Sequence, residues 1–229
     1  WDGDPELARD DHGAPITRWD GITTKKSPVT GEPIPDDTAR IPVYTYKNPR
    51  PAEWPQADFI IGNPPYIGSK RLRISLGDGY VSALRASVHE LPENADYVMY
   101  WWDRAAAIVA TGLARRFGFI TTNSISQTFN RKIVERHLRA DPAVSIAFAI
   151  PDHPWVDSES GADVRVAMTV GGLGGSAGQL VRVEHEERTG DDEVRVALGR
   201  ASGQIQGDLS VGAPVVAANK LAANAAISY

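Results

Sequence analysis

Short apolar runs alternate with amphipathic stretches through the middle of the chain. The apolar runs are rich in branched and aromatic side chains, as expected of buried strands. The amphipathic stretches repeat apolar residues at helical spacing. The predicted strands are 58–62, 117–122, 144–150 and 163–170, and the predicted helices are 95–116 and 130–138. This order of elements predicts an α/β layered domain with a parallel sheet.

The segments on either side follow other patterns. Residues 1–56 contain recurrent Pro and Gly, which exclude a long helix or a central strand and predict an irregular segment. Residues 179–186 and 193–198 alternate apolar and polar positions around a Thr-Gly-Asp-Asp sequence, which predicts a C-terminal β-hairpin. We therefore divide the chain into an irregular segment at 1–56, an α/β part at 57–172, and a hairpin and linker at 173–229.

Composition narrows the class of protein. The 229 residues include no cysteine, which excludes disulfide frameworks, thiol nucleophiles, cysteine-ligated zinc and iron–sulfur clusters. No apolar run approaches the roughly 18 residues of a membrane span, and no leader sequence opens the chain, so we expect a cytoplasmic protein without membrane contact. The chain begins at Trp1 and its methionines, Met99 and Met168, are internal, so we expect a piece of a longer protein.

The net charge of −5 is unevenly distributed. Residues 57–150 carry eleven Lys or Arg against eight Asp or Glu, whereas residues 1–56 carry seven against ten and residues 151–229 six against eleven. An acidic chain does not bind nucleic acid by bulk charge alone. The middle of the chain is its basic part, although solvated helix faces also carry such an excess.

The sequence Asn63-Pro-Pro-Tyr66 follows the first predicted strand, at the sheet edge where open α/β proteins bind ligands. A planar amino nitrogen is a poor nucleophile because its lone pair is delocalised. The Asn63 side-chain oxygen and the Pro64 carbonyl are two acceptors suited to hold its N–H bonds and to localise that lone pair. Pro64 and Pro65 stiffen the loop, and Tyr66 offers a face for stacking an extruded base, worth about 1–3 kcal/mol. The alternative is a stiff turn with Tyr66 in the core.

Residues 61–68, Ile-Gly-Asn-Pro-Pro-Tyr-Ile-Gly, resemble motif IV of the class I methyltransferases that use S-adenosylmethionine to modify adenine N6. Residues 91–105 and 116–124, with Tyr-Trp-Trp and Thr-Thr-Asn-Ser, resemble the methylase region of MmeI-like (type IIL) restriction–modification enzymes. The resemblance covers residues 57–172 and, more loosely, 205–224. It implies a partial Rossmann-like methyltransferase core that uses S-adenosylmethionine as its cofactor. It also implies that Asn63 contacts this cofactor. It also implies Asn63, Pro64, Pro65 and Tyr66 as the catalytic loop, acting on a flipped adenine in double-stranded DNA.

One part of that family's pattern is missing. Nothing in residues 1–57 matches its glycine-rich cofactor loop, and the cluster at Gly171–Gly175 precedes a strand where a cofactor loop would precede a helix. We therefore expect Gly171–Gly175 to be a turn. We also expect the cofactor half, and a target-recognition region beyond the C-terminus, to lie in other domains of the parent protein, and the isolated fragment to be inactive.

Other residues carry two interpretations each. The resemblance places Trp155 against the flipped base, and the alternative is a partly buried loop Trp. Asn123 and Ser124 follow the second strand and are expected to line the base or strand channel. Four cations are candidate phosphate contacts or simply solvated: Lys70, Arg71, Arg73 and Arg131. We expect Asp103 to be a surface charge and His153 a loop residue, and we identify no metal site.

Three functions are consistent with these features. The leading one is methylation of adenine N6 in DNA within a restriction–modification protein. The second is methylation of a protein glutamine amide. Release-factor methylases also carry Asn-Pro-Pro-Tyr-Ile, and the lone pair of a carboxamide nitrogen is delocalised in the same way. The third is a non-catalytic fragment that positions DNA for a larger enzyme.

Overall fold

The computed structural model describes residues 1–88, 90–156, 163–175, 177–188 and 194–212. The chain divides into two units that alternate along the sequence. The first comprises Trp1–Pro55 and Ile67–Tyr97, and the second comprises Gln56–Tyr66 and Val98–Tyr229.

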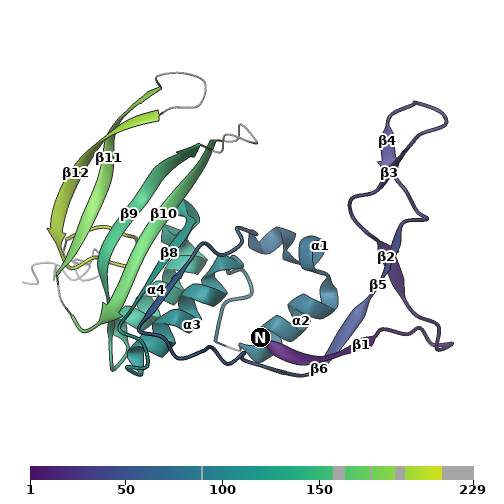
Figure 1. Ribbon diagram of the computed structural model, residues 1–229, viewed down its shortest axis with the longest axis horizontal. Helices are drawn as coiled ribbons and strands as arrows, with labels where there is room; N and C mark the ends of the chain where they lie inside the picture. Colours follow the sequence, from purple (N-terminus) through teal and green to yellow (C-terminus); the bar gives the residue numbers. More distant parts are fainter. Residues whose placement is uncertain (89, 157–162, 176, 189–193, 213–229) are drawn as a thin grey trace, which may run out of the picture. The chain divides into compact units, whose positions relative to one another are not determined.

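Short strands pair in twos in the first unit. Antiparallel pairs join β1 to β6, β2 to β5 and β3 to β4 (Figure 1). The strands are β1 (Asp2–Leu7), β2 (Thr17–Trp19), β3 (Thr24–Lys26), β4 (Pro33–Pro35), β5 (Arg40–Pro42) and β6 (Tyr44–Arg50). The prediction of an irregular segment is therefore wrong. Each strand of a two-stranded ribbon has a free edge, so the missing N–H of proline is tolerated there.

Three helical segments complete the described part of the first unit. They are η1 (Ser69–Arg71), α1 (Leu72–Leu76) and α2 (Asp78–Ser87). Leu72, Val81 and Leu84 are buried. A Cβ at Gly79 would lie 1.8 Å from the Tyr44 carbonyl oxygen, so only glycine permits this approach of α2 to β6.

The second unit is built on a six-stranded sheet in the order β12-β11-β9-β10-β8-β7 (Figure 1). Parallel pairs join β7 to β8 and β9 to β11, and antiparallel pairs join β10 to β8 and β9, and β11 to β12. Its elements are β7 (Phe59–Gly62), α3 (Val98–Ala110), β8 (Arg116–Thr122), η2 (Asn123–Ser126), α4 (Thr128–Arg139), β9 (Val144–Val156), β10 (Asp163–Leu173), β11 (Gly178–Arg188) and β12 (Val194–Gly203).

The sheet is mixed, which corrects the prediction of a parallel sheet. β9 continues through Val156, so only residues 157–162 separate it from β10. A parallel connection needs a crossover of a dozen or more residues, so β10 must return antiparallel. β10 is thereby inserted between β8 and β9, which point the same way. The predicted hairpin turn at residues 189–192 lies outside the described residues.

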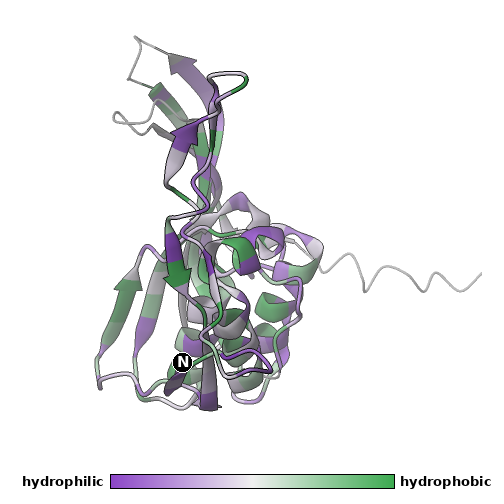
Figure 2. Ribbon diagram, turned by 90° about the vertical axis from the view of Figure 1, so that its right-hand side faces the viewer, coloured by the Kyte–Doolittle hydropathy of each residue, from purple (hydrophilic) through white to green (hydrophobic). Residues whose placement is uncertain are grey.

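Both helices of the second unit pack on one face of its sheet. Trp102 of α3 contacts Phe117 of β8 edge to face, with ring centroids 5.1 Å apart, and its indole N–H donates to Thr169 Oγ1 at 3.1 Å. Figure 2 shows hydrophilic and hydrophobic segments alternating along the strands and helices, as expected of elements with one buried face. The predicted helix 95–116 is shorter than expected, because the chain leaves α3 at Ala110 and Gly112 adopts a φ of +76°.

A buried carboxylate joins α3 to α4. Asp103 is only 9% exposed; His137 Nε2 lies 2.6 Å from its Oδ1, and Arg136 donates to the same oxygen. The prediction of a surface charge at Asp103 is therefore wrong. A buried carboxylate needs such partners to offset its desolvation.

Gly171 and Gly172 belong to β10, so the predicted turn at residues 171–175 is only partly correct. A Cβ at Gly171 would lie 2.2 Å from the Phe117 ring, which packs directly on the β10 backbone. The left-handed residue of this segment is Gly174, with a φ of +96°.

Candidate active site

The Asn-Pro-Pro-Tyr loop directly follows β7. Pro64 is buried, whereas Asn63 and Pro65 are exposed and Tyr66 keeps 37% of its surface exposed. The Tyr66 hydroxyl donates a hydrogen bond to Asn63 Oδ1. Burial raises the pKa of the Tyr66 hydroxyl, so the hydroxyl stays protonated and remains the donor. The Asn63 oxygen therefore already has a partner within the loop.

A second polar segment follows β8. Because β7 and β8 are parallel neighbours, Asn63 and Asn123 both come after carboxyl ends at the same edge of the sheet. The Thr122 and Ser124 hydroxyl oxygens lie 2.5 Å apart, and buried Asn130 of α4 donates to the Ser124 carbonyl at 3.0 Å. These bonds fix Ser124 next to the exposed side chain of Asn123.

The end of β9 extends past this same edge. The sequence predicted a loop after Ile150, but β9 continues through Pro151 and Pro154 to Val156. Among the residues that the structure describes, β9 pairs with β11 at Phe148 and Ala149 alone, so prolines further along β9 lose no ladder hydrogen bond on that side. Trp155, 43% exposed, lies on this strand opposite Val164. His153 is a strand residue, contrary to prediction, and its Nδ1 lies 2.7 Å from the Pro154 carbonyl oxygen.

A bulge in β9 places a carboxylate beside Asn123. Ile150 pairs with Met168 and His153 with Val166, so Pro151 and Asp152 together oppose the single residue between them on β10. Such a bulge changes the direction of the side chains it carries. Asp152 Oδ1 accepts hydrogen bonds from Asn123 Nδ2 at 3.4 Å and from Arg165 Nε at 2.6 Å.

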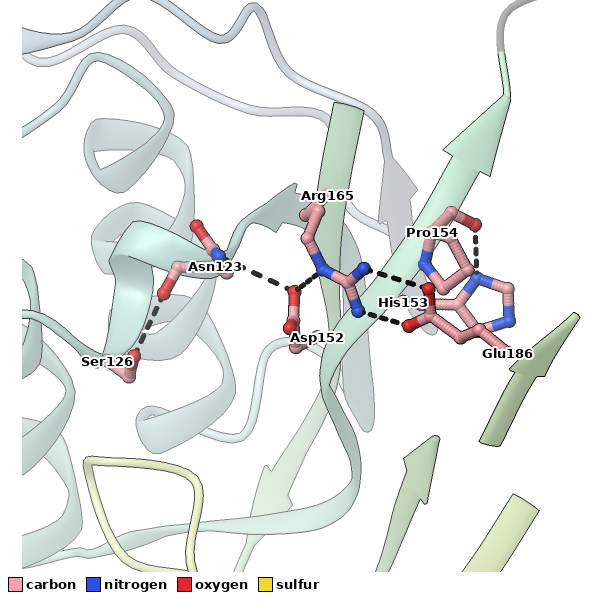
Figure 3. A network of polar contacts seen from close by, with 7 residues as sticks. All are labelled: Asn123, Ser126, Asp152, His153, Pro154, Arg165 and Glu186. Atoms are coloured by element: carbon pink, nitrogen blue, oxygen red, sulfur yellow. Dashed lines mark hydrogen bonds and ion pairs between the residues drawn. The ribbon is translucent and has the colours of Figure 1, made fainter. Parts of the chain in front are cut away.

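Arg165 of β10 connects this carboxylate to β11, as Figure 3 shows. Its two terminal nitrogens donate to the Glu186 carboxylate at 2.6 and 3.2 Å. These hydrogen bonds raise the pKa of the guanidinium and lower that of Glu186. Sequence reasoning missed Asp152, Arg165 and Glu186, because they lie on three strands and only the sheet register brings them together.

The predicted phosphate contacts fall into both units. Lys70 and Arg71 of η1 are exposed and have no ion-pair partner among the residues that the structure describes. Arg73 of α1 donates to Asp78 at 2.8 Å. These three belong to the first unit, whereas Arg131 of α4, with Glu135 at 3.3 Å, belongs to the second unit together with Asn63–Tyr66.

The face of the sheet opposite α3 and α4 is open and apolar. Phe59 and Ile61 of β7 are 55% and 85% exposed, contrary to the prediction of a strand buried on both faces. They line a hollow of about 550 Å³ with Ile120, Phe148, Met168 and Val170. Within the described part of the chain, β7 pairs only with β8, so its other edge is free.

The described residues offer neither a metal cluster nor a membrane-spanning helix. They contain no cluster of three His, Asp or Glu side chains placed to hold a metal ion. None of their helices is long and apolar enough to cross a membrane.

Comparison with known proteins identifies relatives of this arrangement. Residues 18–181 match the family model described as the DNA-methyltransferase domain of MmeI. The solved structure of the type IIL restriction–modification enzyme MmeI in complex with DNA is similar over 68% of this chain and 20% of its own, with 24% identity and a TM-score of 0.53. This chain thus spans about a fifth of the length of MmeI. No curated protein matches the chain.

A second solved structure is less similar. It is the type I restriction–modification methyltransferase subunit from Streptococcus thermophilus, which shares 8% identity over 64% of this chain and 31% of its own. Its TM-score of 0.37 is too low to bear on the fold.

Proposed function

Because the chain belongs to the family of the MmeI DNA-methyltransferase domain, we propose that it carries the catalytic loop for methyl transfer to adenine N6 in double-stranded DNA. The methyl donor is S-adenosylmethionine, and the parent protein is a restriction–modification enzyme. The family match and the DNA bound to MmeI support DNA as the substrate. The chain covers only a fifth of MmeI, so the activity is proposed for the complete enzyme.

The observation that carries the proposal is the placement of Asn63 directly after β7, with its side chain exposed at the carboxyl edge. S-adenosylmethionine supplies a methyl carbon attached to a positively charged sulfur. Asn63 Oδ1 and the Pro64 carbonyl oxygen accept hydrogen bonds from the two N–H groups of the target amine and direct its lone pair at that carbon. The target nitrogen would take over the methyl group that the cofactor supplies and then release a proton to water.

The target base must displace an existing contact, because the Tyr66 hydroxyl already donates to Asn63 Oδ1. The incoming amine replaces that hydroxyl as donor, and the Tyr66 ring is then free to stack on the base. A base within a duplex cannot reach this loop and must be flipped out. Trp155, on the strand that overhangs the same edge, is the candidate for the other side of the base.

The remaining predicted contacts serve the flipped nucleotide and its strand. We assign Asn123 and Ser124 to the base or strand channel. Four cationic side chains are assigned to contacts with the DNA phosphates: Lys70, Arg71, Arg73 and Arg131.

Most of the cofactor site is proposed to lie outside this chain. The hollow on the open face is lined by apolar side chains such as Phe59 and Ile61 and offers no carboxylate for a ribose, so it does not fit the cofactor. Asn63 is the residue of this chain that we assign to cofactor contact. We propose that a cofactor-binding half adds along the free edge of β7, covers the open face and completes a Rossmann-like sheet.

Methyl transfer in the complete enzyme tests the proposal. With labelled S-adenosylmethionine and duplex DNA, Asn63→Ala is expected to lower the rate by about 10²- to 10³-fold, the usual cost of removing one positioned polar group at a reacting centre. Asn94→Ala, which removes another exposed amide, is the matched control and is expected to retain the wild-type rate.

The product separates the alternatives. Digestion of the methylated DNA should yield N6-methyladenine. Label on an offered glutamine-bearing protein would instead identify an amide methyltransferase, and DNA binding without methylation of either substrate would identify a DNA-positioning protein. Full activity of Asn63→Ala would contradict the assignment of the loop.

A further inference from the structure

The side-chain amide of Asn123 has a defined orientation. Its Nδ2 faces Asp152 Oδ1 at 3.4 Å (Figure 3). A carboxylate only accepts hydrogen bonds, so the reversed amide would set two acceptor oxygens against each other. Asn123 Oδ1 has no partner among the described residues and lies on an exposed side chain at the carboxyl edge. The structure thus presents an acceptor at this position.

Asp152 is held from two sides. The bulge at Pro151 and Asp152 directs its side chain, and the Arg165 guanidinium donates to the same Oδ1 at 2.6 Å. Arg165 reaches across β9 to bind Glu186 of β11 with both terminal nitrogens. A planar guanidinium fixed at both ends is a rigid support for the carboxylate.

From this geometry we infer that Asp152, supported by Arg165, is a positioning residue. It fixes the amide of Asn123 so that the oxygen, and not the nitrogen, faces the ligand. The inference rests on the proposed function and deepens it. The ligand at this point is the edge of an extruded base that carries an N–H donor, and a base edge with only acceptors there is disfavoured.

A double-mutant cycle in the complete enzyme tests whether Asp152 acts through Asn123. Asn123→Ala and Asp152→Ala are each expected to lower kcat/KM for DNA by about three- to tenfold, the range for one hydrogen bond. The double variant is expected to lose no more than Asn123→Ala alone, because Asp152 then has no amide to orient. Multiplying losses would overturn the inference.

Conservative variants separate acceptor geometry from charge. Asp152→Asn keeps an oxygen for both donors and is expected to retain kcat/KM within about twofold, although it removes the charge. Glu187→Gln removes a charge from an exposed side chain of β11 outside this network and is the matched control, also expected to retain activity. If Asp152→Asn is as impaired as Asp152→Ala, charge and not amide orientation is responsible, and the inference fails.

A readout independent of methylation keeps the two proposals distinct. In the complete enzyme labelled with ¹⁵N-asparagine, the side-chain amide resonance of Asn123 is identified by its loss in Asn123→Ala. It is expected to shift in Asp152→Ala and not in Glu187→Gln. An unchanged resonance in Asp152→Ala overturns the positioning role. Absence of DNA methylation by the wild-type enzyme, with the shift observed, overturns only the proposed function.

Discussion

Tyr66 combines a ring and a hydroxyl with opposing effects on the proposed reaction. The hydroxyl donates to Asn63 Oδ1, the acceptor that the target amine needs. The ring, 37% exposed, is the surface on which the base stacks. A ligand therefore exchanges one donor for another at Asn63, so the net gain at that oxygen is smaller than a new hydrogen bond would give.

Two substitutions separate these roles. Tyr66→Phe keeps the ring and frees Asn63 Oδ1, so kcat/KM for DNA is expected to stay at the wild-type level or to rise by up to about fivefold. Tyr66→Ala removes the stacking surface, and the loss of about 1–3 kcal/mol should appear mainly as a higher KM for DNA. Steady-state methylation kinetics of both variants measure the difference. Equal losses in the two would show that the hydroxyl, and not the ring, is the important group.

At the residue scale, the sequence identifies groups whose role depends on neighbours along the chain. Asn63 and Tyr66 are identifiable because the two prolines between them fix the local backbone. The role of Asp103 cannot be identified in this way. Its partners Arg136 and His137 are on the following helix, and only tertiary packing makes Asp103 a buried residue. Asp152 is missed for the same reason, since it meets Arg165 through the strand register.

At the element scale, apolar patterning located the strands of the second unit but not their lengths or directions. β9 is longer than predicted because Pro151 and Pro154 resemble a strand end, yet they fall where β11 no longer pairs with β9. Beyond Leu180 of β11, no ladder bond joins these two strands within the described residues. The ion pair between Arg165 and Glu186 connects β10 to β11 across that gap.

This connection is expected to depend on pH. The pKa of Glu186 is lowered from 4.5 by its hydrogen bonds with Arg165, so the unfolded chain takes up a proton at Glu186 before the folded one does as pH falls. The stabilisation is therefore fully present above about pH 4.5 and is lost as pH falls through the lower folded value. The melting temperature of the wild type minus that of Glu186→Gln should be positive at pH 7 and should shrink below pH 4.5. A difference that grows in acid would contradict this sign.

At the scale of the whole molecule, the second unit has one covered and one open sheet face. Trp102 and its neighbours fill the covered face, while Ile61 remains 85% exposed on the other. Covering one such side chain stabilises an assembly by about 1.5–3 kcal/mol. Under the proposed function, the cofactor-binding half covers this face. A substitution on the face should therefore affect cofactor binding only in a protein that contains that half.

A charge on the open face tests this expectation. In the complete enzyme, Ile61→Lys is expected to weaken binding of S-adenosylmethionine by tenfold or more, because a cation would be buried without a partner. Ile22→Lys, at a side chain 84% exposed in the first unit, is the matched control and should bind normally. Titration calorimetry measures both, with thermal unfolding to verify folding. Equal affinities for the cofactor in the two variants would show that nothing covers Ile61.

The prolines of the ribbons have a consequence for solubility. Pro33 and Pro35 of β4 and Pro49 of β6 lack the N–H that another strand would need, so these strands are poor templates for association between molecules. β7 has no such protection, since Phe59–Gly62 contains neither proline nor charge. At high concentration, the strand that precedes the catalytic loop is therefore the site at which copies of this chain would begin to aggregate.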